Sequence, residues 1–236
     1  MHGNAVAFDA VLSELEREPF DEIVSLGDVA QGGPQPAECI DRLRDLGCRC
    51  VLGNSDEFVL TLDPSGEDAD AERRERLLTV GRWSQEQLGP ERLDFQRSFE
   101  PTVELDLAGA RLVCCHGSPR SNEEIVVPQT PREQTRELIG GAAGVVGGHV
   151  HRQWLDHFGE KVWISVGSVG LAYDFKEPMD ERPFLPFAEY AIVTASRGQL
   201  GVEFRRVRYD VEAVRSAIRA SGIPHGDEFA SRWADS

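Results

Sequence analysis

The sequence has no apolar run that approaches the roughly 20 residues needed to span a membrane. Near its start it has no basic segment followed by an apolar one, so we expect no secretory signal peptide. Its five cysteines are an odd number and form no Cys-x-x-Cys pair, which argues against a disulfide framework. From these absences we expect a cytoplasmic protein with no membrane partner.

Positive charge is also scarce. The chain carries 25 Lys and Arg against 41 Asp and Glu, a formal net charge of -16 at pH 7. Such a field repels nucleic-acid backbones, so we do not expect a nucleic-acid partner. A small phosphate-bearing substrate would need local positive charge, which bound metal ions would supply. Solubility is the simplest explanation for most of the acidity.

The length of 236 residues and a hydrophobic content of 40% are typical of one large α/β domain, here residues 1–236. Neither a repeat nor a linker divides the chain. Strand-helix-strand units in the first half predict a parallel sheet, and later hairpins add antiparallel strands. The predicted strands are 23–26, 50–52, 102–107, 110–115, 142–146, 154–158, 162–166, 190–195 and 200–207. The predicted helices are 5–18, 36–46, 132–139, 211–221, and one or two helices within 68–96 that are interrupted near Gly89-Pro90.

The clearest chemical signal follows the strand predicted at 142–146. There the chain reads Gly147-Gly148-His149-Val150-His151. Alternate residues of a regular strand point to opposite faces, but two adjacent glycines allow both imidazoles to turn toward one point. Imidazole is the commonest metal-binding side chain, so the two histidines are a candidate ligand pair. Two ordinary loop histidines would produce the same pattern.

The same design recurs at other predicted strand ends, where a glycine stands beside a side chain that can bind metal. In open α/β sheets, ligand sites form where the carboxyl ends of strands converge. Together these strand ends supply one carboxylate, one amide and three imidazoles. That number of ligands is too large for one closed tetrahedral zinc, but it suits two ions that share a bridging carboxylate. These strand ends are Gly27-Asp28, Gly53-Asn54, His116-Gly117 and Gly148-His149-Val150-His151.

Taken in order, these motifs resemble those of the calcineurin-like metallophosphoesterases, and the resemblance covers most of the chain. The turn Gly167-Ser168-Val169-Gly170 is similar to the one that follows the last motif in the bacterial YfcE-like phosphodiesterase branch. The implied fold is a four-layer α-β-β-α sandwich of two mixed sheets. The matching motifs are His2-Gly3-Asn4, Gly27-Asp28, Gly53-Asn54-Ser55-Asp56, His116-Gly117 and Gly148-His149-Val150-His151.

The resemblance implies a centre of two divalent metal ions, with Asp28 bridging them. His2 and His151 would bind one ion. The other would be bound by Asn54, His116 and His149. The donors are nitrogen and oxygen without thiolate, so they suit manganese, iron, zinc or magnesium better than a thiophilic metal. Of these, manganese is the expected ion, with iron, zinc and magnesium as alternatives.

The resemblance also implies the reaction, which is hydrolysis of phosphodiesters or small phosphomonoesters by attack of a metal-bridging hydroxide. The residues implied to be catalytic are Asp28, Asn54 and His116. Because water is the nucleophile, the reaction needs no Ser-His-Asp set, and none is evident in the sequence.

One departure from the family pattern concerns the start of the sequence. The family opens with Asp-x-His at the end of a first strand, whereas here Met1 takes the x position before His2. That strand would be central and buried, so its loss should open the core and expose sheet edges. A misassigned start codon or a shortened chain is the favoured explanation. A degenerate protein with one impaired metal site is the alternative.

Two further departures concern the substrate. Many members carry a histidine after Gly-Asn that protonates the leaving group, but here Ser55 is a poor proton donor. The rate of hydrolysis of an aryl ester or a pyrophosphate would fall less, because the leaving groups of these substrates need no general acid. Asp56 either replaces the acid or holds the turn, and we favour the turn. Because Gly27-Asp28 is not followed by Asp-Arg, as it is in protein serine/threonine phosphatases, phosphoproteins and dinucleoside tetraphosphates are disfavoured.

Two other functional classes compete with hydrolysis of phosphate esters. A non-catalytic metal- or nucleotide-binding module on the same scaffold is favoured by the missing aspartate and by Ser55. An amidohydrolase also uses His-x-His, but it places the pair early, on a first barrel strand.

Arg120 is either a phosphate contact or, as we favour, a solvated loop residue. The segment 173–187 is either a lid over the site or an ordinary loop. The sequence does not identify the natural substrate or the oligomeric state.

Overall fold

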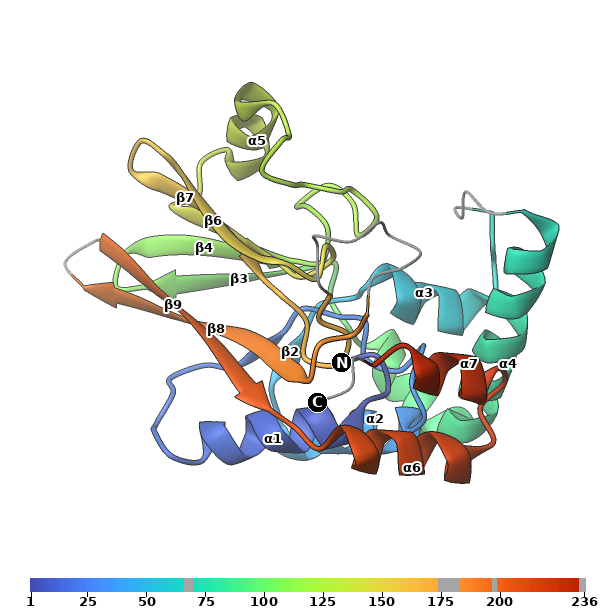
Figure 1. Cartoon of the computed structure of the whole chain (residues 1–236). Helices are drawn as coiled ribbons and strands as arrows, with labels where there is room; N and C mark the ends of the chain where they lie inside the picture. The colour runs from blue at the N-terminus through green and yellow to red at the C-terminus, as the bar shows by residue number, and fades with distance from the viewer. Residues whose placement is uncertain (66–69, 174–182, 197–198, 234–236) are drawn as a thin grey trace.

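The structure is a computed structural model of the chain, and it describes residues 1–65, 70–173, 183–196 and 199–233. Figure 1 shows the arrangement of the elements. In chain order they are α1 (Ala5–Leu15), β1 (Val24–Ser25), α2 (Pro36–Leu46), β2 (Arg49–Cys50), α3 (Asn54–Thr61), α4 (Ala71–Arg97), β3 (Thr102–Leu107), β4 (Ala110–Cys115), α5 (Arg132–Ile139), β5 (Gly144–Gly147), β6 (Gln153–Phe158), β7 (Lys161–Val166), β8 (Phe187–Ser196), β9 (Gln199–Arg208), α6 (Val211–Ser221) and α7 (Gly226–Ser231).

The largest sheet has five strands in the order β3-β4-β5-β7-β6. Its three central strands are parallel, and the outer strands β3 and β6 pair antiparallel to their neighbours. The central strands are apolar because both faces of the sheet are covered. Helix α5 covers one face through a core that contains Leu138, Ile139 and Trp163. The opposite face packs on a second layer of strands.

This second layer consists of the parallel pair β1-β2 and the antiparallel hairpin β8-β9. Its contact with the five-stranded sheet is a core that includes Val51, Val146, Ile164 and Val193. Helices α1, α2, α4 and α6 lie beyond it, as Figure 1 shows. The molecule is therefore the mixed α/β sandwich that the sequence predicts. The second layer differs in one respect: it forms two separate pieces instead of one mixed sheet.

The predicted helix boundaries rest on recognisable local signals. The Asn4 side chain accepts a hydrogen bond from the Ala7 amide and so begins α1. Pro36 begins α2, and Gly47 ends it with a φ of 66°. The interruption predicted in α4 is present at Gly89, where φ is 63° and ψ is 176°. The patterns therefore predicted these breaks correctly.

Two helices were missed by the sequence patterns, α3 and α7. Helix α3 begins directly at the Gly53-Asn54 motif, because the Asp56 carboxylate accepts a hydrogen bond from the Gly53 amide at 3.1 Å. Most of the segment predicted as a lid or loop, residues 174–182, lies outside the described residues. None of the helices in the described ranges is long and apolar enough to cross a membrane.

Candidate metal centre

The six residues predicted as metal ligands meet at one edge of the two strand layers. His2 precedes α1, and Asp28 follows β1. Asn54 is the first residue of α3, directly after the Gly53 turn. The remaining three follow the parallel strands β4 and β5: His116, His149 and His151. They come together because these strand ends converge at the same edge of the fold.

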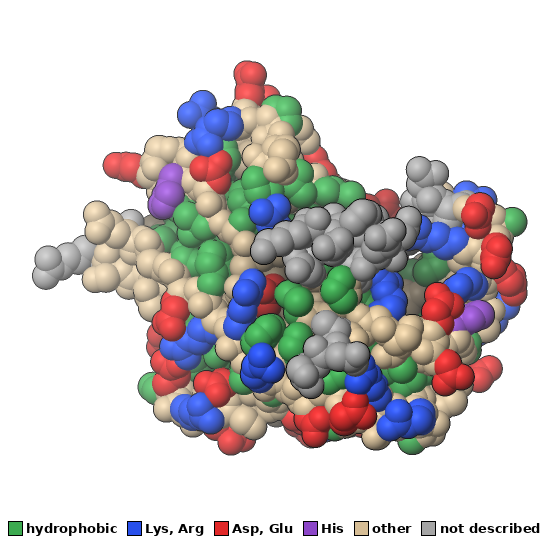
Figure 2. All heavy atoms as spheres, viewed as in Figure 1, with side chains coloured by type: hydrophobic (Ala, Val, Ile, Leu, Met, Phe, Trp, Pro, Cys, Tyr) green, Lys and Arg blue, Asp and Glu red, His purple; other side chains and the backbone are tan. Residues whose placement is uncertain are grey.

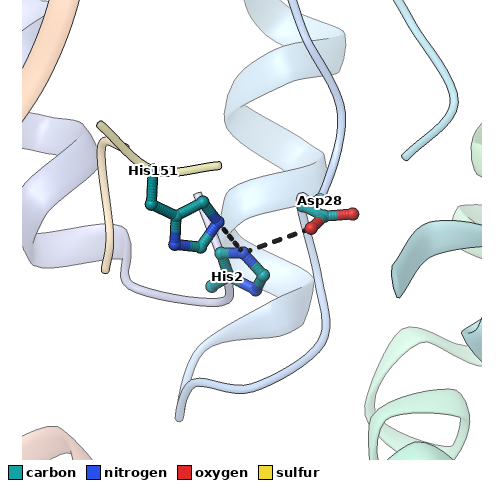
Figure 3. Close-up of side chains that lie close together, drawn as sticks. All are labelled: His2, Asp28 and His151. Carbon is teal, nitrogen blue, oxygen red and sulfur yellow. Dashed lines mark hydrogen bonds and ion pairs between the residues drawn. The ribbon is translucent and has the colours of Figure 1, made fainter. Parts of the chain in front are cut away.

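The Asp28 carboxylate lies between two groups of imidazoles. Its Oδ2 atom is 3.3 Å from Nε2 of His2 and 3.2 Å from Nε2 of His116. Figure 3 shows the first group, in which Nε2 of His2 also lies 3.0 Å from Nε2 of His151. In the second group, Nε2 of His116 lies 3.1 Å from Nδ1 of His149. Within each group the candidate ligand atoms all lie within 4.8 Å of one another.

Asn54 belongs with the second group. Its Oδ1 atom is 3.1 Å from Nε2 of His116. His2, Asp28 and His151 are at most 9% exposed, whereas Asn54 and His149 are half-buried. The centre is therefore more open to solvent on the side of the second group.

Backbone carbonyls fix the tautomer of three of the histidines. The Nδ1 atom of His2 lies 2.9 Å from the Gln31 carbonyl oxygen, and that of His116 lies 2.6 Å from the Leu26 carbonyl oxygen. The Nδ1 atom of His151 lies 3.0 Å from the carbonyl oxygen of Leu171. A carbonyl can only accept, so each Nδ1 carries the proton and each Nε2 presents a lone pair to the centre.

This arrangement leaves electron pairs facing one another. In the neutral tautomers, Nε2 of His2 and Nε2 of His151 are both acceptors, yet they are 3.0 Å apart. Nε2 of His116 likewise faces the oxygen atoms of Asp28 and Asn54. Such buried acceptors need a proton or a cation between them. One divalent ion in each group would bind all of these lone pairs. The nitrogen and oxygen atoms present therefore fit the metal centre that the family resemblance implies.

The charges in the centre depend on one another. Burial alone would raise the pKa of Asp28, but the charge and hydrogen bond of His116, helped by His2, hold it well below its usual range. Burial alone would lower the pKa of His116, but the charge and hydrogen bond of Asp28, together with the Leu26 carbonyl, raise it above its ordinary value. Asp28 is therefore the anion around which the centre is built.

The His-x-His pair stays neutral near pH 7. Burial, and then the neighbouring His116, lower the pKa of His149 to about 4. Burial, and then His2, lower the pKa of His151 well below its usual range. Neutral imidazole is the form that binds metal, so both residues are ready to act as ligands without releasing a proton.

The backbone is strained at three of the candidate ligands. His2, Asp28 and His151 each have a φ of 54°, in the left-handed region that residues with a Cβ rarely adopt. Each such residue costs about 1–2 kcal/mol, which the surrounding structure must offset. Part of that support is the hydrogen bond from the His2 amide to the Asp28 carbonyl, at 2.7 Å.

Two glycines allow the Asp28 and Asn54 turns to approach each other. A Cβ at Gly27 would lie 2.5 Å from the amide nitrogen of Gly53, and a Cβ at Gly53 would overlap the Asp28 carboxylate. Only residues without a side chain fit at both positions. The glycine beside each ligand is thus required for packing and is more than a turn signal.

Asp56 holds these two turns together. Its fully buried carboxylate accepts hydrogen bonds from the amides of Asp28 and Val29, at 2.7 and 2.9 Å, and from the amide of Gly53. Burial and then the Asp28 charge raise the pKa of Asp56, while the Val29 and Gly53 amides oppose that rise. Its carboxylate is occupied by backbone donors, which supports the turn-holding role that the sequence favours.

Sequence patterns missed one side chain near the centre. Gln96 donates from Nε2 to the Asp56 carboxylate at 2.9 Å, and it stands in no motif that links it to the site. Tyr173, the first residue of the segment predicted as either a lid or a loop, stacks its ring on His151 at 5.4 Å. Arg120 is exposed and pairs with Glu124 at 2.7 Å, in agreement with its interpretation as a loop residue.

Residues 1–182 match the family model of the calcineurin-like phosphoesterase superfamily domain. The chain belongs to this superfamily. The five motifs that carry the resemblance all lie within the matched range, and the predicted membership is therefore confirmed. The YfcE-like branch stays a prediction.

Known relatives of this calcineurin-like phosphoesterase cover nearly all of it. An uncharacterized protein of Methanocaldococcus jannaschii is 24% identical over 232 residues, which are 95% of this chain and 91% of that protein. A metallophosphoesterase from Sphaerobacter thermophilus is similar in structure, with a TM-score of 0.72 and 25% identity, over 98% of this chain and 94% of that one. A hypothetical protein from Pyrococcus horikoshii has a TM-score of 0.79 at 17% identity, over 98% and 93% of the two chains, and shows the fold alone.

Proposed function

We propose that this chain is a metal-dependent phosphoesterase that uses two divalent ions to hydrolyse phosphodiesters or small phosphomonoesters. The observation that supports this most strongly is the position of Asp28, whose Oδ2 atom lies 3.3 Å from His2 and 3.2 Å from His116. When bound, such ions would lower the pKa of a water nucleophile toward neutrality and offset negative charge on the phosphoryl group. Manganese is the proposed metal, with iron, zinc and magnesium as alternatives.

The six candidate ligands would bind the two ions in two groups. His2 and His151 would hold one ion, Asn54, His116 and His149 would hold the other, and Asp28 would contact both. The carbonyls of Gln31, Leu26 and Leu171 keep three of the imidazoles in the tautomer that ligation requires. The protein thus orients the ligands before any metal binds.

The substrate would reach the centre from the side of Asn54 and His149, because these two ligands are half-buried and the others are buried. Acidic and basic side chains are interspersed on the face shown in Figure 2, without the broad basic stripe that nucleic-acid binding requires. Together with the net charge of -16, this supports a small phosphate ester as the substrate. All five cysteines are free, which supports the proposed cytoplasmic location.

Removing the metal should abolish hydrolysis. The chain would be treated with chelator, checked by elemental analysis, and assayed on bis(p-nitrophenyl) phosphate and p-nitrophenyl phosphate while Mn²⁺ is added back. We expect activity to return with the added metal and to level off near two ions per chain. Parallel titrations with Zn²⁺ and Mg²⁺ would identify the most effective metal. Undiminished turnover by chain shown to be metal-free would rule the proposal out.

A metal-binding module without catalytic activity is the second candidate function. One observation favours it: among the described residues, the group around His2 contains only His2, Asp28 and His151, whereas Asn54 adds a fourth ligand to the other group. The same titration separates the two candidates. Tight binding of two ions without hydrolysis of either ester would favour the module.

Ser55 should make the reaction sensitive to the leaving group. It stands in the first turn of α3, where its amide donates to Oδ1 of Asp28 at 2.9 Å, and its hydroxyl is a poor acid. We expect Ser55→His to raise the rate on an alkyl phosphodiester by about 10²-fold and to change the rate on a p-nitrophenyl ester far less. Ser55→Asn is the matched control, because it adds bulk without a titratable proton. Equal effects of both variants on both esters would show that the position supplies no acid.

A further inference from the structure

One exposed apolar side chain lies close to the open side of the candidate metal centre. Among the described residues, Ile125 and Phe204 are the large apolar side chains that are strongly exposed, at 62% and 36%. Ile125 belongs to the segment 118–127 between β4 and α5, which we call the rim segment, and Phe204 belongs to β9. A single exposed apolar residue is ordinary on a protein surface, so its position decides whether it has a role.

The rim segment connects the two half-buried candidate ligands. In its first half, Asn122 donates from Nδ2 to the Glu57 carboxylate at 2.9 Å. Glu57 lies on α3, about one turn after Asn54, so this bond holds the rim segment near Asn54. In its second half, Val126 lines a small cavity together with His149. The rim segment therefore runs along the side of the centre that is open to solvent.

Contacts on both sides of Ile125 keep its side chain outside the core. On one side, the backbone of Glu124 packs against Gly117, where an added Cβ would lie 2.8 Å from the Glu124 carbonyl oxygen. The Ser118 hydroxyl also donates to the Glu124 carboxylate. On the other side, Val126 is buried in the core between the five-stranded sheet and α5. Because both neighbours are fixed, Ile125 stands at the rim, where a molecule entering from the open side would meet it.

The charged side chains of the rim segment do not favour a contact with phosphate. Arg120 pairs with Glu124 at 2.7 Å, which offsets its charge. Glu123 is exposed and repels a phosphate group. With the phosphate held at the candidate metal centre, Ile125 would face the part of the ester that carries no charge, which is its alcohol.

We propose that Ile125 is a specificity-determining residue that selects phosphate esters of apolar alcohols. Its side chain would pack on the alkyl or aryl group of the alcohol, and this contact would remove apolar surface of both partners from water. The inference rests on the proposed function, because it takes the phosphate to be bound beside Asn54 and His149. It adds the chemical class of the alcohol, which the candidate ligands do not determine.

The test measures binding instead of turnover. Methylphosphonate and pentylphosphonate carry the same anionic head group, and neither contains an ester bond that can be hydrolysed. Their dissociation constants for the Mn²⁺-loaded chain would be measured by isothermal titration calorimetry. We expect pentylphosphonate to bind about tenfold more tightly, because each fully buried methylene is worth about fourfold and the added methylenes would be buried only in part. In Ile125→Ser this preference should fall to about twofold, and in Ile125→Leu it should be retained.

Phe204→Ser is the matched control. It removes the other strongly exposed apolar side chain, from a strand that supplies no candidate ligand. Its preference for pentylphosphonate should equal that of the parent chain. Because the side chain of Ile125 is mostly exposed, we expect both of its variants to fold.

The proposal would be overturned, with the proposed function intact, if the loaded chain bound both phosphonates equally or if Ile125→Ser kept the full preference. Tighter binding of 2-aminoethylphosphonate than of pentylphosphonate would also overturn it, because the rim segment would then select a cationic alcohol. Failure of the chain to bind Mn²⁺, or of the loaded chain to bind either phosphonate, would instead refute the proposed function and this inference with it.

Discussion

Replacing Asp28 with asparagine should lower kcat/KM for bis(p-nitrophenyl) phosphate by at least about 10³-fold, which corresponds to about 4 kcal/mol of transition-state stabilisation. The Asp28 carboxylate lies between both imidazole groups, and the charge of His116 depends on it. Asparagine keeps the shape but removes the anion that both ions would share. We also expect fewer ions per chain by elemental analysis, because each candidate group loses its only carboxylate.

The matched control is Asp156→Asn. Asp156, on the outer strand β6, pairs with Arg132 of α5 at the protein surface, so its loss should leave activity and metal content unchanged. An Asp28→Asn variant that kept activity within about twofold of the parent would refute the central role of this carboxylate.

Replacing Asp56 with asparagine should have the largest effect on stability. Its carboxylate accepts hydrogen bonds from three backbone amides and from the Gln96 side chain, and it is fully buried. An asparagine would direct an NH₂ group at some of these donors and leave them unpaired, at a cost of about 3 kcal/mol. We expect the thermal unfolding midpoint to fall by about 10 °C. Metal affinity should fall by at least about tenfold, because the Asp28 turn loses its support.

Asp210→Asn is the control for this prediction. The Asp210 carboxylate begins α6 by accepting one hydrogen bond from the Ala213 amide at 3.1 Å, at an exposed position. Asparagine is an equally good residue there, so stability should change by no more than a few tenths of a kcal/mol. Equal thermal unfolding midpoints for the Asp56 and Asp210 variants would show that the buried Asp56 carboxylate does not hold the Asp28 and Asn54 turns together.

The gathering of the ligand side chains could be predicted from the sequence for a physical reason. Parallel strands such as β4 and β5 end at one edge of a sheet, so His116 and His149 had to lie close together. The glycine next to Asp28 and the glycine next to Asn54 marked two of these strand ends, and the structure adds that they allow the two turns to approach each other closely. The position of a ligand thus followed from the end of a strand and a neighbouring glycine.

The partners that hold these ligands could not be predicted. His2 and His151 are oriented by the carbonyls of Gln31 and Leu171, and every residue carries a carbonyl, so the sequence offers no signal for this choice. Helix α3 was missed because Gly53-Asn54-Ser55-Asp56 fits a turn as well as a capped helix. The identity of Gln96 as a partner of Asp56 depends on how α4 packs against α3, which no local pattern encodes.

The central claim, that Asp28 joins two metal ions, is tested most directly by crystals of the chain grown with Mn²⁺ and measured at the anomalous edge of manganese. The account predicts two anomalous peaks, one beside His2 and His151 and one beside His116 and His149, both in contact with the Asp28 carboxylate. A single peak at saturating Mn²⁺, or peaks remote from Asp28, would contradict it.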